Sequence, residues 1–478
     1  PGSVKLQIGQ SQRLLVSGLF SDQARADLTT SALYQSSNQG VATVDSDGTV
    51  RGMTAGKAVI TATVGKLQAT LPLEVQDQSF PSTPEFQTDV VAALSRGGCN
   101  QGACHGSPQG KGGFLLSLRG FDPEVDRASL TRAEFGRRLN AMEPENSLLL
   151  LKPTVRLPHQ GGRQLRKTEE AYQVLHRWIA SGHPVSSEPR QLSELEVLPT
   201  SGQLHDSAPQ QQLVVRAHFT DGSVQDVTGL AVFTTADNAA AMVSPDGKVS
   251  FSNTAEAAIL VRYLGLIKTA RLTYIRSADN FSFQAPPEKN FIDKHVFSRQ
   301  QRLQLNPAPL AGDAVFLRRV YLDSIGAIPT PDEARAFLES DAPDKRAHLI
   351  DSLLQREEYS QFWALKWADV MRANRQAVSL RGVHSFHRYP VRIFADDQPL
   401  DQVARQILTS RGNTIHYPEA NFYRIARTPD DAAESFSRLF LGVRIQCAKC
   451  HNHPYDSISQ QDYYRLSAHF ARVKLKGL

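Results

Sequence analysis

The sequence contains very little of several residue types that define common protein classes. Its 478 residues include four cysteines, four methionines and three tryptophans. No apolar run approaches the roughly 18 residues of a membrane-spanning helix, and no block of consecutive basic residues marks a nucleic-acid track. Lys and Arg number 53 against 48 Asp and Glu, a net charge of +5 spread over a long chain. We therefore expect no transmembrane segment and no nucleic-acid partner.

The four cysteines form two close pairs, and each pair is followed directly by a histidine. Cys99 and Cys104 precede His105, and Cys447 and Cys450 precede His451. No cysteine is left over for a disulfide framework. The spacing of the pairs instead indicates two sites of metal or cofactor chemistry.

An internal repeat organises the rest of the sequence. Short segments recur 199 residues later, and the matched pairs are Phe20-Ser21-Asp22 with Phe219-Thr220-Asp221, Asp27-Leu28-Thr29 with Asp226-Val227-Thr228, and Asp47-Gly48-Thr49-Val50 with Asp246-Gly247-Lys248-Val249. Alternating apolar residues and Asp-Gly turns around them are typical of antiparallel strands. The repeat predicts two small β-sandwiches, over residues 1–78 and 191–278. The first resembles the bacterial immunoglobulin-like domains of group 2, whose closing stretch often reads like Gly52–Ala58.

Helical periodicity follows each sandwich, over residues 84–188 and 286–478. In the first helical segment, Val90–Leu94 predicts an early helix, and a last helix begins with Thr168 as N-cap and runs to Gly182. In the second, Thr330 precedes a helix with acidic residues in its first turn. The fold class is therefore multidomain, with two all-β immunoglobulin-like sandwiches alternating with two mainly α-helical domains. Each helical domain holds one Cys-Cys-His cluster.

The second cluster has the spacing of a c-type haem attachment sequence. In Cys447-Ala448-Lys449-Cys450-His451 the two thiols would form thioethers with the porphyrin, and His451 would be the proximal iron ligand. Zinc is the alternative, but a tetrahedral site needs four ligands, and the neighbouring Cys450 and His451 rarely both point inward.

The first cluster has four residues between its cysteines instead of two. The longer loop can still bridge both vinyl groups if it bulges, so we expect Cys99 and Cys104 as haem thioethers and His105 as proximal ligand. The chain would then carry two covalently attached c-type haems.

Longer stretches around the clusters resemble planctomycete cytochrome c-like domains. Residues 98–106 and 113–123 are similar to the first kind, and residues 318–323 and 439–454 are similar to the second kind. The resemblance implies cytochrome c-like haem domains in secreted or surface-associated proteins, without an established substrate. Related chains usually continue into a further C-terminal domain, so a segment could have been removed after Leu478.

The sixth iron ligand of the first haem is expected between the haem motif and the last helix of that domain. His159 takes the place that a Met-Pro methionine commonly fills in small cytochromes c. Met142 is the alternative, and we expect His176 and His183 on the surface.

For the second haem, we assign His387 as the sixth ligand, because the family pattern usually has a histidine followed by arginine there. The alternatives are His384, His416, Met371 or an open coordination position. His453 lies too close to His451 in the chain to reach the opposite face of the ring, so a supporting hydrogen bond suits it better.

Two other motifs are rejected. Gly106–Gly112 resembles a phosphate loop, but its spacer is one residue short and Gly112 stands where Ser or Thr must meet magnesium. Repeated aspartates such as Asp27 and Asp226 could suggest calcium, but at a strand turn they are better read as turn formers.

These features predict a diheme c-type cytochrome for extracytoplasmic electron transfer with a redox partner protein or another cytochrome. A haem enzyme of peroxidase type, with an open site at the second haem, is one alternative. The other is a structural or adhesive surface protein with subsidiary haems, capable of self-assembly or a surface complex. Because c-type haem is attached outside the cytoplasmic membrane, we expect a periplasmic, secreted or surface location. Since no signal-like segment precedes Pro1, we also expect a processed chain.

Overall fold

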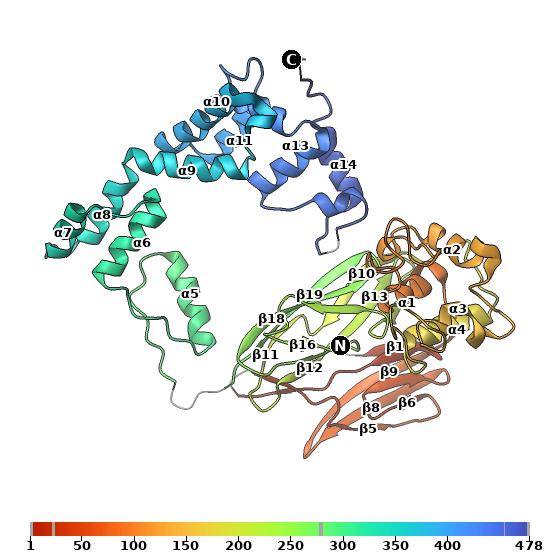
Figure 1. Cartoon of the computed structure of the whole chain (residues 1–478). Coiled ribbons are helices and arrows are strands. Elements are labelled where there is room, and N and C mark those ends of the chain that lie inside the picture. Colours follow the sequence, from red (N-terminus) through yellow and green to blue (C-terminus); the bar gives the residue numbers. More distant parts are fainter. Residues whose placement is uncertain (1–2, 22–23, 277–280, 454, 476–478) are drawn as a thin grey trace. The chain divides into compact units, whose positions relative to one another are not determined.

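The structure is a computed structural model that describes residues 3–21, 24–276, 281–453 and 455–475. Two compact units divide the chain, one of Pro1–Asn306 with Tyr455–Ser457 and one of Pro307–Pro454 with Ile458–Leu478. The expected domain limits at residues 1, 278 and 478, and Asp22 of the repeat, lie outside the described residues. The first unit is rich in β-strands and the second is helical (Figure 1).

The first repeat forms a four-stranded and a three-stranded sheet, ordered β1-β9-β8-β5 and β2-β7-β6. Their shared core includes Leu6, Val50, Ile60 and Val75. The strands of this repeat are β1 Val4–Ile8, β2 Ser11–Arg13, β3 Ser17–Leu19, β4 Arg25–Asp27, β5 Leu33–Ser36, β6 Ala42–Val44, β7 Thr49–Gly52, β8 Gly56–Val64 and β9 Leu67–Ser79. Residues alternate between buried and exposed along β8, as the period of a half-buried strand requires.

The second β segment has the strands β10 Leu192–Leu198, β11 Ser201–Leu204, β12 Gln210–Gln212, β13 Val214–Phe219, β14 Val224–Asp226, β15 Val232–Thr235, β16 Met242–Val243, β17 Lys248–Ser250, β18 Ala255–Tyr263 and β19 Leu266–Tyr274. Its central hairpin consists of β18 and β19. The first residue of each of these strands lies 199 residues after the first residue of β8 and β9, respectively. In the first hairpin Val64 pairs with Leu67, and in the second Tyr263 pairs with Leu266. The sequence repeat is therefore a repeat of strands and register.

The two β repeats share one sheet, which the sequence did not predict. The sheet runs in the order β15-β18-β19-β11-β4-β3, so the β3–β4 hairpin of the first repeat extends the sheet of the second. Leu204 of β11 pairs with Arg25 of β4 in parallel. The repeats are thus joined by backbone pairing.

Short helices separate the two β repeats. They are η1 Phe86–Val90, α1 Val91–Arg96, η2 Leu118–Gly120, α2 Pro123–Thr131, η3 Ala133–Gly136, η4 Pro144–Asn146, α3 Leu148–Leu151 and α4 Glu170–Ala180. The expected early helix at Val90–Leu94 is present. The last helix begins later than expected, because Glu169 and not Thr168 is its N-cap and no side chain caps it.

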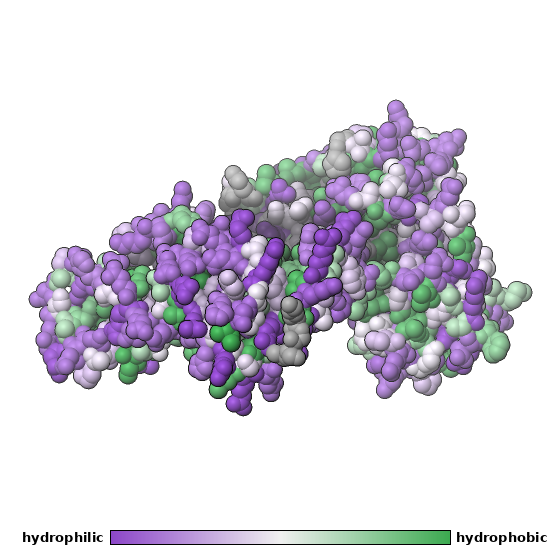
Figure 2. Space-filling view, turned by 90° about the horizontal axis from the view of Figure 1, so that it is seen from above, coloured by the Kyte–Doolittle hydropathy of each residue, from purple (hydrophilic) through white to green (hydrophobic). Residues whose placement is uncertain are grey.

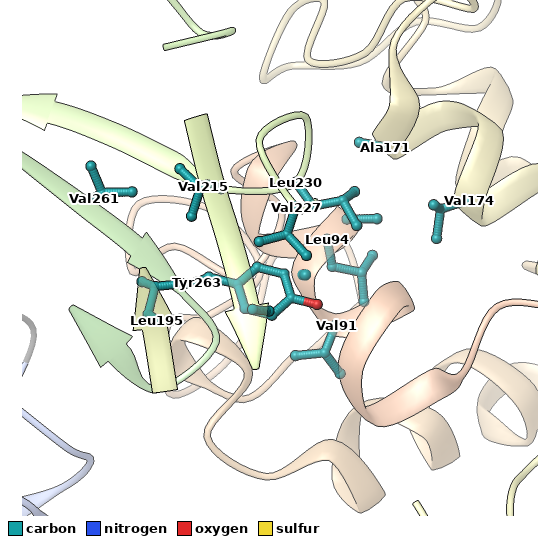
Figure 3. Packing of buried hydrophobic residues seen from close by; sticks show 14 of the residues in the cluster. Val91, Leu94, Ala171, Val174, Leu195, Val215, Val227, Leu230, Val261 and Tyr263 are labelled. Atoms are coloured by element: carbon teal, nitrogen blue, oxygen red, sulfur yellow. The ribbon is translucent and has the colours of Figure 1, made fainter. Parts of the chain in front are cut away.

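The helical segment and the second β repeat share a single hydrophobic core. Val91 and Leu94 of α1, Trp178 of α4, and Val215 and Tyr263 of the sheet belong to one buried cluster. Figure 3 shows the ring of Tyr263 reaching from the sheet toward Val91 and Leu94. Helix α4 contributes six buried residues, so it packs as an amphipathic helix. This shared core fixes the helices that carry the first cluster against the sheet.

Helix α5, Phe291–Arg302, belongs to the first unit, where Arg299 and Arg302 form ion pairs with Glu256 of β18. The second unit contains α6 Asp313–Ile325, α7 Pro331–Glu339, α8 Lys345–Leu354, α9 Glu357–Val370, α10 Arg375–Ala395, α11 Leu400–Thr409, η5 Pro418–Ala420, α12 Asn421–Ile425, α13 Pro429–Phe436, η6 Ser437–Leu441, η7 Gln446–Lys449 and α14 Gln460–Ala468. The expected cap at Thr330 is present as a full capping box with Glu333.

Two cores stabilise the second unit. The smaller contains Leu317, Tyr321, Phe337 and Leu353, and the larger gathers α10 to α14 around residues such as Phe386. Within the described ranges no helix is long and apolar enough to cross a membrane. Hydrophilic residues cover most of the face in Figure 2, with small apolar patches between them.

Candidate functional site

The first Cys-Cys-His cluster lies in a tight loop that begins where α1 ends. Gly98 adopts a left-handed conformation with φ of 70°, which terminates the helix and turns the chain into the loop. Inside the loop, the amides of Cys104 and Gly106 both donate to the carbonyl of Gln101, and the amide of His105 donates to the carbonyl of Cys99 at 3.0 Å. These bonds make the four-residue spacer between Cys99 and Cys104 bulge and fold back on itself. Such a bulge is what attachment of both thiols to one haem would need.

Both thiols of this loop are partly buried. Cys99 packs against the main hydrophobic core. Burial, with a smaller contribution from the neighbouring Cys104, raises the pKa of the Cys99 thiol to about 12. Cys99 is therefore a neutral thiol at neutral pH. Both cysteines are free, so no disulfide joins them.

The ring of His105 is held from one side by backbone carbonyls. Its Nδ1 lies 3.1 Å from the carbonyl oxygens of both Lys111 and Phe114, and its ring packs on Phe114 with centroids 4.6 Å apart. Because carbonyl oxygens only accept, Nδ1 carries the proton and the lone pair is on Nε2. Burial lowers the pKa of His105, which favours this neutral form. A histidine oriented in this way is prepared to ligate a metal through Nε2.

His159 lies opposite His105 in the loop after α3. Its Nδ1 is 2.8 Å from the carbonyl oxygen of Gly162, so its Nε2 is also the free nitrogen. The centroids of the two imidazole rings are 6.4 Å apart, and their planes are inclined by only 18°. The two residues that the sequence assigned as axial ligands of the first haem are thus brought together.

Arg138 supports this arrangement, and sequence reasoning did not single it out. The residue is only 5% exposed, and its guanidinium donates to the carbonyls of Gly113, Ser129 and Ala133. It also lies over the ring of Phe114, 4.8 Å from the centroid. Arg138 therefore fixes the loop whose carbonyls orient His105. Nothing in the sequence distinguishes it from the chain's many other arginines.

The alternative ligand Met142 and the histidines His176 and His183 do not pack against His105 in the way that His159 does. Met142 is 91% exposed. His176 lies on α4 beside Tyr172, with Nε2 3.8 Å from Glu145, and His183 contacts Trp178. Each of these two histidines has neighbours of its own, away from His105.

The second cluster is more open. Cys447 and Cys450 are both exposed, while Ala448 between them is fully buried in the larger core of the second unit. Lys449 anchors the motif through an ion pair of 3.0 Å with Asp430 of α13, and its carbonyl accepts bonds from Gln460 and Tyr464 of α14. Both thiols are therefore presented at the surface of a well-packed turn.

The histidines around the second cluster are not brought together as they are at the first. His451 places Nδ1 2.6 Å from the carbonyl of Asn452, and the amide of His453 donates to Ile458. His387 lies half-buried on α10. Between the described His387 and His451 no ring contact is found, so the assignment of His387 stays a prediction.

The other candidates for the second haem differ in exposure. His384 and His416 are exposed, and Met371 is buried in the core of the unit. Throughout the part of the chain that the structure describes, no three His, Cys, Asp or Glu side chains gather closely enough to hold a metal ion. At the first cluster the structure brings together two imidazoles, those of His105 and His159, and Cys99 and Cys104 lie in the same loop as His105.

Comparisons with known families match two parts of the chain. Residues 1–75 match the family described as "Bacterial Ig-like domain (group 2)", which confirms the resemblance of the first repeat. Residues 291–475 match the family PSCyt2, described as "Protein of unknown function (DUF1549)". The second description assigns no cofactor.

Individual proteins give only partial similarity. Ice-binding protein 1 of Shewanella frigidimarina (strain NCIMB 400) is 40% identical over 63 residues, which is 13% of this chain and 7% of that protein. The chain thus spans a small part of that relative. Domains 5-6 of the S-layer protein SbsC cover 58% of this chain and 95% of their own, with 12% identity and a TM-score of 0.25. Domains 4-9 of SbsC cover 57% and 30%, with 11% identity and a TM-score of 0.24. Scores at this level do not show a common fold.

Proposed function

We propose that this chain is a c-type cytochrome with two covalently attached haems that transfers electrons outside the cytoplasm, to a redox partner protein or another cytochrome. One observation carries the proposal: the rings of His105 and His159 lie 6.4 Å apart, and on each ring a backbone carbonyl holds Nδ1, which leaves Nε2 for a ligand. The two cysteines of an attachment motif lie in the same loop as His105.

A c-type haem needs two thiols for its attachment and imidazole nitrogens as iron ligands, and the first cluster supplies residues of these types. Cys99, Cys104 and His105 lie in one loop, and the ring of His159 lies 6.4 Å from that of His105. By their chemistry, these residues fit a c-type haem.

Each residue of the site has a defined part in this proposal. The thiols of Cys99 and Cys104 attach the group through thioether bonds. The carbonyls of Lys111 and Phe114 hold the ring of His105, and that of Gly162 holds the ring of His159. The bound haem supplies a one-electron couple at its iron. If both His105 and His159 held the iron, they would leave no place on it for a substrate, which would favour electron transfer over catalysis at this site.

The second cluster supplies the other attachment site through Cys447, Cys450 and His451. Its exposed thiols are accessible for attachment. His387 is its proposed sixth ligand, and an open position there is what the haem-enzyme alternative requires.

The test is expression of the whole chain together with a c-type haem attachment system. We expect haem that remains bound during denaturing electrophoresis, at two per chain, and about one per chain after replacing Cys447 and Cys450 with alanine. Absence of covalent haem would refute the proposal.

Axial ligation is tested in a chain that carries only the first haem. His159→Ala should make the ferrous haem react with carbon monoxide, while the parent stays unreactive. His176→Ala in the same domain is the matched control and should leave the spectrum unchanged. Equal carbon monoxide reactivity of parent and His159→Ala would contradict the ligand assignment. Reactivity of the second haem in the full chain would favour the enzyme alternative at that site.

A second candidate function is a structural or adhesive surface protein in which the haems are subsidiary. The match of residues 1–75 to bacterial Ig-like domains and the sheet shared by the two β repeats favour it. It would replace the first proposal if the chain carried no covalent haem and formed large assemblies in sedimentation experiments.

A further inference from the structure

The second unit contains a cavity of about 730 Å³ that no sequence motif marks. Its walls come from the first half of α10, the turn over residues 410–415, helix α12 and the segment Val473–Leu475. Neither Cys447 nor Cys450 lines it. A cavity of this size lies within the range of about 300–1,000 Å³ that is typical of small-molecule sites.

The charge of the cavity is of one sign. Four cationic residues line it, namely Arg411, Arg424, Arg427 and Lys474, and no Asp or Glu is among its lining residues. Among the described residues none of the four forms a salt bridge. The guanidinium of Arg427 donates only to the carbonyls of Arg424 and Ala377. Four uncompensated cations in one cavity repel each other, and an anion placed among them would relieve that repulsion.

Two residues beside the cavity have positive φ values, which interrupt the regular helical backbone. Helix α10 is interrupted at Ser379, whose φ is 66° and ψ is 169°. Gly412 has a φ of 98° in the turn opposite. These breaks let Ser379 and Asn413 line the cavity as uncharged hydrogen-bonding groups.

Part of the lining is apolar. Ile415, Val473 and Leu475 are apolar residues of the lining that are 42–47% exposed. A bare inorganic ion would leave these residues without a partner, whereas an organic molecule would cover them. The combination of cations with exposed apolar side chains therefore suits an organic anion.

We propose that this cavity binds a small organic molecule bearing at least two oxyanion groups, such as a sugar bisphosphate, a sulfated sugar or a polycarboxylate. The arginines provide the planar donor forks that match phosphate, sulfate and carboxylate oxygens. Because the cavity contains no residue of the two Cys-Cys-His clusters, the proposed anion binding does not depend on whether the chain carries haem.

The test is titration calorimetry of the whole chain with fructose 1,6-bisphosphate, citrate and a trisulfated heparin disaccharide. We expect saturable binding of at least one probe at one molecule per chain, weaker at high salt, and no binding of fructose. The probe that binds identifies which oxyanion the site prefers. Binding of none of the three at millimolar concentration would overturn the proposal.

Matched variants locate the site. Arg424→Gln and Arg411→Gln should each weaken binding at least tenfold. Arg411 is exposed, and its side chain has no hydrogen bond among the described residues, so its replacement should not disturb folding. Arg405→Gln, an equal charge change on the exposed face of α11, should alter binding less than twofold. Equal losses in Arg405→Gln and Arg411→Gln would show unspecific attraction and refute the site.

Discussion

Asp27 and Asp226 occupy the same position in the two β repeats, and each accepts a hydrogen bond from the other repeat. Oδ2 of Asp27 accepts from the amide of Gln212 at 2.6 Å, and Oδ2 of Asp226 accepts from the amide of Arg13 at 2.7 Å. The two acceptors and the two donors are both 199 residues apart. The repeats are thus locked together by a reciprocal pair of bonds that follows the internal symmetry of the chain.

Each aspartate has a local role as well. Oδ1 of Asp27 accepts from the amide of Thr29, and Oδ1 of Asp226 accepts from the amide of Thr228. These are the turn bonds that the sequence predicted. One carboxylate therefore shapes its own turn and joins the partner repeat.

Replacing Asp27 with alanine should destabilise the first unit by about 2 kcal/mol, since the Gln212 and Thr29 amides both lose their acceptor. Asp221→Ala is the control, because within the described residues the carboxylate of Asp221 bonds only to Ser223 in its own turn. We expect the control to cost less than about 1 kcal/mol. Urea unfolding followed by circular dichroism measures both, and equal losses would contradict a special role for the interface bond.

Gly106→Ala should disrupt the loop of the first cluster. A Cβ at this position would overlap the carbonyl oxygen of Asn100, which is backbone and cannot move aside. Gly102→Ala is a matched control in the same loop, since its Cβ would meet only Leu118 at an ordinary 3.7 Å. We expect Gly106→Ala to lower the melting temperature by several degrees and to reduce haem attachment at this cluster, with little change in Gly102→Ala. An unchanged melting temperature in Gly106→Ala would show that the loop has another conformation.

Arg138→Ala should destabilise the helical segment by about 2–4 kcal/mol, because three carbonyls lose a buried charged donor. The exposed neighbour Arg137 provides the control, and Arg137→Ala should change stability by less than about 0.5 kcal/mol. In the haem-loaded chain, Arg138→Ala should also alter the absorption spectrum of the first haem, because the loop that orients His105 loosens. A stability loss without any spectral change would limit Arg138 to folding.

Asp126 should make the stability of the first unit depend on pH. It is fully buried and accepts bonds from the amide and hydroxyl of Ser117. Burial raises its pKa to about 6, in spite of those bonds. The folded state therefore holds the proton more tightly than the unfolded chain, whose aspartate pKa is about 3.9, so stability falls as the pH rises from about 4 to 6 and is level above that.

Asp126→Asn should remove this slope, because the amide is neutral at every pH and can still bond to Ser117. Above pH 6 the variant should be more stable than the parent by about 2 kcal/mol, and near pH 4 the two should be alike. Asp126→Ala should be less stable than Asp126→Asn throughout, since the Ser117 amide then lacks an acceptor. Urea unfolding at a series of pH values measures these differences, and a slope that survives in Asp126→Asn would assign it to another group.

Local signals in the sequence predicted several features well. The helix after Thr330 has its capping box. Strands β12, β14, β15, β17, β18 and β19 begin 199 residues after β2, β4, β5, β7, β8 and β9, respectively. The cap at Thr168 was wrong because the chain makes a turn there, in which the amide of Glu169 donates to Arg166, before the helix begins. A residue type that favours the N-cap position takes that position only when the backbone after it adopts helical dihedral angles.

Spacing along the chain is enough to predict the repeat, the alternation of strands and helices, and the two Cys-Cys-His clusters. Folding alone brings Asp27 to Gln212, His159 to His105 and Arg138 to the carbonyl of Gly113. These contacts join residues far apart in the sequence. Their geometry is set by the common core of helices and sheet, which no local pattern encodes.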